Sequence, residues 1–268
     1  MNLSEEDYRL LQKAADILEN PSLTAKITDF IGTPVEKAFQ YLPAKWNERI
    51  GGITQAALRK ALEISIYSMK NMRGKFSSNR FHKIISGASG AVGGAFGLAA
   101  LSIELPVSTT IMLRSIADIA RSEGEDINSV EAQLSCLEVF ALGGKSEKDD
   151  SAESGYFTVR LTLAKSISEI TKYITKKGIA EEGTPLLIRF IVKVSTRFGI
   201  QVSEKAAAQA VPLIGAAGGA IINLLFIDHF QNIAWGHFTI RRLERKYGQE
   251  VIRNEYENIM RKINITLK

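Results

Sequence analysis

The residues that could carry out chemistry lie at the ends of two uncharged, glycine-rich segments. Glu104 follows the first segment, with Arg114 and Asp118 after it, and Asp228 and His229 follow the second. Carboxylates, an imidazole and a guanidinium in one cleft could supply the acid, the base and the anion-binding group of a hydrolase. These five side chains are therefore the candidate catalytic residues, provided that the fold brings the two segments together.

The same residues also have simpler interpretations. Arg114, Asp118 and Arg121 follow one another at steps of four and three, which is typical of ion pairs on an exposed helix. Such a pair contributes only about 0.2–0.5 kcal/mol. The Asp-His pair of the second half would be hydrogen-bonded where two helices meet. Its histidine and His237 are eight residues apart, about 12 Å along a helix, so we expect no metal site and no cofactor.

The first uncharged segment, residues 84–103, is twenty residues long, enough to cross a bilayer. Its side chains are mostly small, however, and gain little by transfer into lipid. Glycines in both uncharged segments are spaced to lie on one helix face, where a second helix can approach closely. These helix-packing glycines are Gly87, Gly90, Gly94, Gly97, Gly215 and Gly219. We expect two central glycine-rich helical hairpins, and conditional insertion into a membrane stays open.

Helical periodicity predicts an all-α fold, and no run alternates like a strand. The expected helices include 4–20, about 46–73, 129–142 and 155–177. Ser4 is the expected cap of the first helix, Thr33 with Pro34 is expected to begin the second, and Pro106 is expected to begin another. The chain is expected to form a single domain over residues 1–268, with a polar loop at 143–155.

The two halves of the chain resemble each other. A shift of 124 positions places Glu104 on Asp228 and Gly124 on Gly248, and each glycine-rich segment on the other. This pattern indicates half-repeats at about 84–124 and 206–248 and a pseudo-two-fold arrangement. The alternative is a coincidence between two similar helices.

Charge and composition narrow the class of partner. The net charge is +5, and residues 237–268 hold eight Lys and Arg against four Asp and Glu. The basic side chains Arg241, Arg242, Arg245 and Lys246 could contact anionic lipid, although a solvated helix face is the simpler interpretation. Nucleic acid is not an expected partner, because neither a helix-turn-helix pattern nor aromatic platforms are evident. The lone Cys136 lies in an apolar setting, so a buried structural thiol is expected.

Several long motifs resemble those of the EcsC family. They are FGLAALSIELPVSTTIMLRSIADIARSEGED with CLEVFALGG, and VPLIGAAGGAIINLLFIDHFQNIAWGHFTIRRLERKYG. The family is named after a protein encoded beside the two components of a bacterial ABC transporter, and no catalytic residues are agreed for it. The resemblance therefore implies a bacterial protein, cytoplasmic or peripheral to the membrane, and leaves its biochemistry open.

Together these features favour a non-enzymatic protein at the cytoplasmic face of the membrane. Its expected partner is anionic lipid or a membrane protein such as a transporter, and its oligomeric state is open. The start of the chain has no secretory signal pattern, which favours the cytoplasm. Two alternatives remain: a hydrolase with a site between the half-repeats, and a membrane-active effector that inserts its glycine-rich hairpins.

Overall fold

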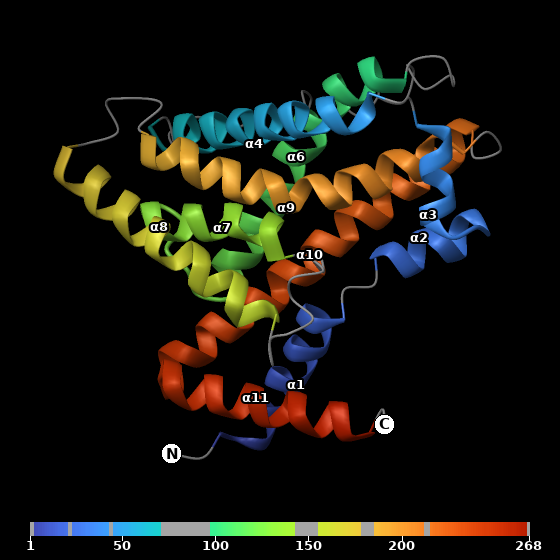
Figure 1. Cartoon of the computed structure of the whole chain (residues 1–268). Coiled ribbons are helices and arrows are strands. Elements are labelled where there is room, and N and C mark those ends of the chain that lie inside the picture. The colour runs from blue at the N-terminus through green and yellow to red at the C-terminus, as the bar shows by residue number, and fades with distance from the viewer. Residues whose placement is uncertain are drawn as a thin grey trace. The chain divides into compact units, whose positions relative to one another are not determined.

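The computed structural model describes residues 3–20, 23–42, 45–70, 97–142, 155–177, 185–211 and 215–266 (Figure 1). Within these ranges every regular element is a helix, so the prediction of an all-α fold is confirmed. Gly87, Gly90 and Gly94, together with residues 143–154 of the predicted loop, lie outside the described residues. No helix in the described ranges is long and apolar enough to cross a membrane.

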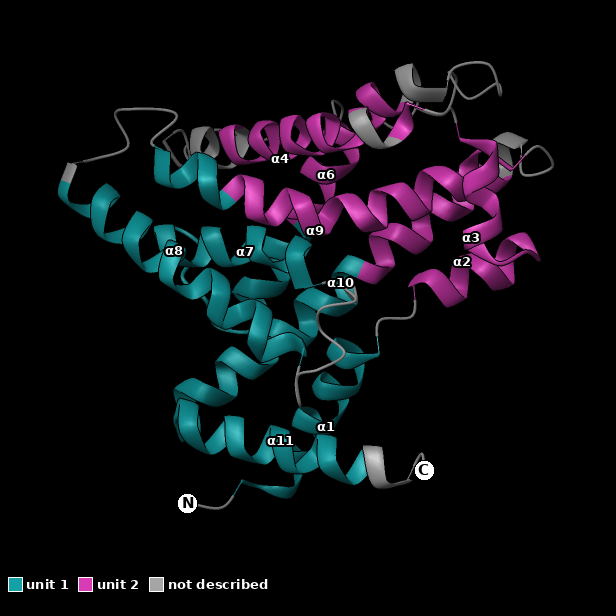
Figure 2. Ribbon diagram, viewed as in Figure 1, with its two compact units in different colours: residues 1–21, 115–190, 230–268 teal, residues 22–114, 191–229 magenta. Residues whose placement is uncertain are grey.

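The chain forms two compact units, each assembled from segments that are distant in sequence (Figure 2). Unit 1 comprises residues 1–21, 115–190 and 230–268, and unit 2 comprises residues 22–114 and 191–229. Three long helices contribute residues to both units: α6 (Gly97–Ser122), α9 (Pro185–Gln209) and α10 (Gly215–Tyr247). The predicted single domain over the whole chain stays a prediction.

Unit 1 is built around α7 (Val130–Leu142), a helix that is buried on nearly every side. It packs against α8 (Gly155–Lys177), and α1 (Glu5–Glu19) packs against both α8 and α11 (Gln249–Thr266). The predicted cap at Ser4 is confirmed, and Ser129 caps α7 in the same way. The Ser4 hydroxyl accepts from the Asp7 amide at 3.2 Å, and the Ser129 hydroxyl accepts from the Ala132 amide at 3.2 Å.

Unit 2 contains α2 (Leu23–Ile31), α3 (Val35–Ala38), the 3-10 helix η1 (Phe39–Tyr41) and α4 (Trp46–Lys70). Thr33 was expected to cap a helix with Pro34 in its first turn, and this was wrong. Pro34 itself precedes α3 with an extended backbone and makes no side-chain cap. The Thr28 hydroxyl accepts from the Val35 amide instead, at 3.3 Å, so an upstream helix satisfies the donor that a cap would have satisfied.

The prediction that Pro106 begins a helix is also wrong. Pro106 lies inside α6, which runs without interruption from Gly97 to Ser122. A proline within a helix costs about 3 kcal/mol because it cannot donate an N–H bond and its ring clashes with the preceding turn. Leu105, which directly precedes Pro106, and Met112, which follows it further along α6, are both almost fully buried. Their burial in a shared core can offset that cost.

The helices α6 and α10, each of which contains part of an uncharged segment, end in similar ways. Gly124 lies two residues beyond α6 with a φ of 83°, and Gly248 directly follows α10 with a φ of 93°. Side chains rarely tolerate this left-handed conformation, and glycine adopts it readily. Gly124 and Gly248, which the predicted repeat aligns, thus have the same left-handed conformation after a helix. The repeat itself stays a prediction.

Candidate functional site

The five candidate catalytic residues lie in α6 and α10. Asp228 and His229 were expected where two helices meet, but both lie inside the continuous α10. Asp228 accepts from the Lys26 ammonium at 3.2 Å, and His229 is buried. On α6, Asp118 pairs with Arg121 at 2.9 Å on an exposed surface, and Arg114 is exposed. The exposed Asp118–Arg121 pair agrees with the simpler structural interpretation.

Glu104 belongs to a buried polar cluster in unit 2 that joins α6, α9 and α10. The Lys205 ammonium donates to Glu104 at 2.6 Å and to Asn223 at 2.8 Å. The Lys205 side chain is 0% exposed and that of Glu104 is 20% exposed. The ammonium also lies 4.9 Å from the ring centroid of Phe226, within reach of a cation–π contact. Since Glu104 is paired with Lys205 and Asp228 with Lys26, the hydrolase hypothesis gains no support from these contacts.

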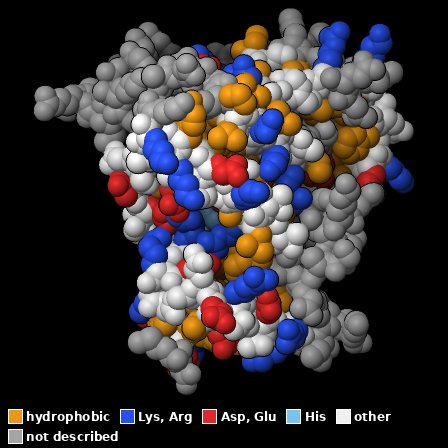
Figure 3. Space-filling model, turned by 60° about the vertical axis from the view of Figure 1, so that its left-hand side comes forward, with side chains coloured by type: hydrophobic (Ala, Val, Ile, Leu, Met, Phe, Trp, Pro, Cys, Tyr) orange, Lys and Arg blue, Asp and Glu red, His pale blue; other side chains and the backbone are white. Residues whose placement is uncertain are grey.

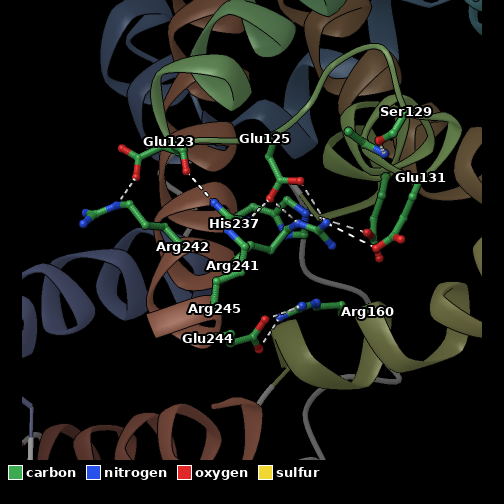
Figure 4. A network of polar contacts seen from close by, with 12 residues as sticks. Glu123, Glu125, Ser129, Glu131, Arg160, His237, Arg241, Arg242, Glu244 and Arg245 are labelled. Carbon is green, nitrogen blue, oxygen red and sulfur yellow. Dashed lines mark hydrogen bonds and ion pairs between the residues drawn. The ribbon is translucent and has the colours of Figure 1, made fainter. Parts of the chain in front are cut away.

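The four basic residues predicted to contact lipid form ion pairs inside unit 1, and Figure 4 shows those of Arg241, Arg242 and Arg245. Arg241 makes two hydrogen bonds to Glu125, at 2.8 and 3.0 Å, and Arg245 bonds the same carboxylate. Arg242 donates to Glu123 at 2.7 Å. Lys246 donates to the buried Asp7 at 2.7 Å. Each of the four charges therefore has a carboxylate close by, and contact with lipid stays a prediction for them.

The pKa values of the two central carboxyls agree with this pairing. Hydrogen bonds from Lys246 first, and then from Tyr247, lower the pKa of Asp7 to about 2. Burial raises the pKa of Glu125, but the hydrogen bonds and charges of Arg241 and Arg245 outweigh it and leave the pKa below its ordinary value. Both carboxylates are therefore ionised at neutral pH and compensate the charges of their basic neighbours.

A pocket of about 480 Å³ opens beside these ion pairs. Its charged lining residues are Arg160, Arg241, Arg245, Glu125, Asp126, Glu131 and Glu244. Each of the three arginines has a carboxylate partner within the same lining. The lining holds three basic and four acidic residues, so it offers no excess of positive charge to an anionic ligand.

The exposed face of α9 carries a different arrangement of charge. Within unit 2, Val192, Thr196 and Ile200 are exposed at four-residue steps, and the two aliphatic side chains are 43% and 40% exposed. Lys193 and Arg197 form a parallel row one position further along. Ile188 and Arg189, which precede these residues along α9 and belong to unit 1, are also exposed. Figure 3 shows one face of the molecule, on which hydrophobic and basic side chains lie side by side with acidic side chains among them.

The first part of α9 contains basic residues and no acidic residue. Between Pro185 and Ser203 the sequence contains three basic residues, Arg189, Lys193 and Arg197, and no Asp or Glu. The inward side chains of the helix, including Phe190, Val194 and Phe198, are buried. The periodicity that placed these residues in the core also defines the outward rows. The sequence alone thus indicates both outward rows. The residues predicted to contact lipid, however, were Arg241, Arg242, Arg245 and Lys246, at the end of α10.

Cys136 is buried, as predicted, and burial is the main cause that raises the pKa of its thiol to about 12. A thiol with such a high pKa is a poor nucleophile at neutral pH. In the described part of the chain, no group of three or more His, Cys, Asp or Glu side chains could hold a metal ion. Neither the thiol nor a metal centre therefore offers a catalytic site among these residues.

A profile of the EcsC protein family matches residues 5–243. The chain belongs to the EcsC protein family. The matched range of this EcsC-family chain includes all of α9 and the Glu104–Lys205–Asn223 cluster, whereas Arg245 and Lys246 lie beyond it. No curated protein and no solved structure matches the chain.

Proposed function

We propose that this EcsC-family protein associates peripherally with anionic membrane surfaces and acts there without catalysing a reaction. The observation that carries the proposal is the exposed face of α9, with its aliphatic row beside a basic row. Helices that lie in the interface of a bilayer combine these two kinds of side chain, with aliphatic groups among the headgroups and cations against anionic lipid. Anionic phospholipid is the proposed ligand because Arg189, Lys193 and Arg197 follow one another at four-residue steps beside the aliphatic row.

The expected strength of the contact follows from its composition. A basic residue near an anionic leaflet contributes about 1 kcal/mol, and an aliphatic side chain contributes in proportion to the apolar area that it buries. Because the inward half of α9 is part of the protein core, the helix would meet the membrane along its side and at shallow depth. Reversible binding is the expected mode.

Further exposed aliphatic side chains in unit 2 favour the same function. Ile103 on α6 is 74% exposed and Leu224 on α10 is 65% exposed. Both border the Glu104–Lys205–Asn223 cluster, since Ile103 adjoins Glu104 and Leu224 adjoins Asn223 in sequence. Exposed apolar residues at neighbouring sites are a feature of surfaces that contact membranes or partners.

Vesicle flotation tests the proposal with protein-free liposomes. The wild type should float with vesicles that contain phosphatidylserine and remain mostly soluble with phosphatidylcholine alone. R189Q/K193Q removes two charges from the basic row, and at about 1 kcal/mol each we expect affinity to fall about 30-fold. V192S/I200S should also weaken binding, because it removes the aliphatic contact.

The matched control is K165Q/K172Q, which removes two exposed lysines from α8. This variant should float like the wild type. Equal recovery of the wild type in the soluble fraction with and without anionic lipid would contradict the proposal. Binding to native membranes but not to protein-free vesicles would also contradict it, and would point to a membrane protein as the partner.

A further inference from the structure

Unit 1 contains a buried carboxyl and a buried imidazole that face each other without bonding. Glu138 on α7 is 2% exposed and His237 on α10 is 0% exposed. The distance from His237 Nε2 to Glu138 Oε2 is 3.7 Å, about 1 Å longer than a hydrogen bond. Within the described structure, His237 Nε2 and Glu138 Oε1 have no hydrogen-bond partner. Buried polar atoms without partners cost about 1–3 kcal/mol each, so this pair calls for an explanation.

The other ring nitrogen of His237 is held by a tyrosine. His237 Nδ1 lies 3.0 Å from the hydroxyl of Tyr156 on α8, and either group can be the donor. Arg160 Nη1 donates weakly to the same hydroxyl at 3.4 Å. The Tyr156 ring in turn stacks near Tyr256 of α11, whose hydroxyl donates to Glu19 of α1. The hydrogen bond at Nδ1 therefore depends on which tautomer the imidazole adopts.

The cations nearest to this pair are already engaged elsewhere (Figure 4). Arg160 makes two hydrogen bonds to Glu244, at 2.7 and 2.6 Å. Arg241 makes two hydrogen bonds to Glu125. The charges of Arg160 and Arg241 lower the pKa of Glu138, and the charge of Glu244 raises it. Among the described ion pairs, neither arginine is paired with Glu138. An ionised Glu138 would thus be a buried anion without a cation of its own.

We propose that Glu138 and His237 form a buried pH switch that changes the tautomer of the imidazole. In the acidic form Glu138 is a carboxylic acid whose O–H faces a bare Nε2, and Nδ1–H donates to the Tyr156 hydroxyl. In the basic form the pair has released one proton to solvent. The remaining imidazole proton is on Nε2, facing the carboxylate, and the Tyr156 hydroxyl donates to Nδ1.

The titration behaviour of the two groups places this change near neutrality. Burial raises the pKa of Glu138 to about 7, against the opposing charges of Arg160 and Arg241. Burial also lowers the pKa of His237 well below its ordinary value, and the same two arginines add to this effect. The imidazole therefore stays neutral while the carboxyl titrates, so the switch moves a single proton.

Nitrogen-15 NMR of histidine-labelled protein tests the proposal on the wild type. The sequence has three histidines, and H237Q identifies the signals of His237 by their disappearance. Between about pH 5 and about pH 9, the protonated nitrogen of His237 should change from Nδ1 to Nε2, with a midpoint near the titration of Glu138. An imidazole that keeps one tautomer across this range, or becomes doubly protonated within it, overturns the proposal.

A variant separates the switch from a histidine that merely fills the core. E138Q keeps the shape of the side chain but cannot ionise, and its amide can donate to Nε2. We expect E138Q to hold His237 in the Nδ1–H tautomer at every pH in the range. E250Q, an exposed position on α11, should leave the wild-type change intact. A His237 tautomer change that persists in E138Q contradicts the assignment, and the wild-type titration decides alone if E138Q does not fold.

Discussion

At the scale of residues, the buried charges of unit 1 are arranged as pairs supplied by different helices. Arg160 on α8 and Glu244 on α10 have side chains that are only 14% and 7% exposed. A buried ion pair of this kind adds little net stability relative to apolar residues, because both charges must leave water. Removal of one partner is costly, since it leaves the other charge buried and uncompensated.

This asymmetry gives a testable prediction for Arg160. R160M should lower the free energy of unfolding by about 3–5 kcal/mol, because Glu244 remains buried without a cation. R160M/E244M should recover most of that loss, since it removes both charges. Urea unfolding of the wild type and the two variants measures the difference. A double variant no more stable than R160M would show that the loss comes from packing of the arginine stem.

A second prediction concerns the pH dependence of stability at Glu138. Its pKa rises from 4.5 in the unfolded chain to about 7 in the native state, so the native state binds more protons between these values. The stabilisation is fully present below pH 4.5 and is lost as pH rises through about 7, a change of about 3 kcal/mol. His237, whose pKa is lowered, acts in the opposite direction and loses its contribution as pH falls.

The comparison with E138Q isolates the carboxyl, because His237 is present in both proteins. Denaturant unfolding at several pH values should show the stability of the wild type falling relative to E138Q as pH rises from about 4.5 to about 7.5. Parallel curves for the two proteins across that range would contradict the prediction.

The candidate site residues differ in how far the sequence reveals them. Glu104 directly follows the first uncharged segment and was noticed for that reason, and Asn223 lies within the second. Lys205, their partner, was missed, although it follows buried Phe198 and Val202 at helical spacing and so shares their face. Glu138 was missed in a similar way, inside a helix that is buried on nearly every side. A lone charge in such a position indicates burial, but its partner comes from a helix distant in sequence.

At the scale of elements, periodicity predicted most helices because their inward faces repeat at three- and four-residue steps. The errors arose where local signals competed with packing. Pro106 is a typical helix start, but it lies inside α6 because both adjoining turns belong to one core. The nine-residue α2 has no counterpart among the predicted helices. It is too short to show a clear period, and its position depends on contacts that sequence alone does not give.

Two glycines within helices lead to predictions of opposite sign. A Cβ at Gly236 in α10 would lie 3.0 Å from Leu18 Cγ and 3.4 Å from the Ala14 carbonyl oxygen of α1. Crowding of a packed core costs about 1–3 kcal/mol, which exceeds the gain in helix propensity, so G236A should be destabilised by about 1 kcal/mol. G51A, where a Cβ meets nothing within 4 Å, should gain up to about 1 kcal/mol. Thermal unfolding measures both, and equal shifts would contradict the argument from close packing.

At the scale of the whole molecule, charge is distributed unevenly among the long helices. The net charge is +5, yet the basic residues at the end of α10 have carboxylate partners: Arg241, Arg242, Arg245 and Lys246. On the outward face of α9, the basic residues Arg189, Lys193 and Arg197 lie beside a row of exposed aliphatic side chains. An attraction to anionic lipid should therefore depend more on α9 than on α10.

The salt dependence of vesicle binding tests this distribution. Exposed charges are screened over about 10 Å at 0.1 M salt and about 3 Å at 1 M, so high salt should weaken wild-type binding strongly. R189Q/K193Q has already lost the main attraction and should lose little more, while V192S/I200S, which keeps the charges, should remain as salt-sensitive as the wild type. If R189Q/K193Q loses affinity with salt as steeply as the wild type, the attraction comes from other charges. The basic residues of α10 would then be the lipid contact, as the sequence first suggested.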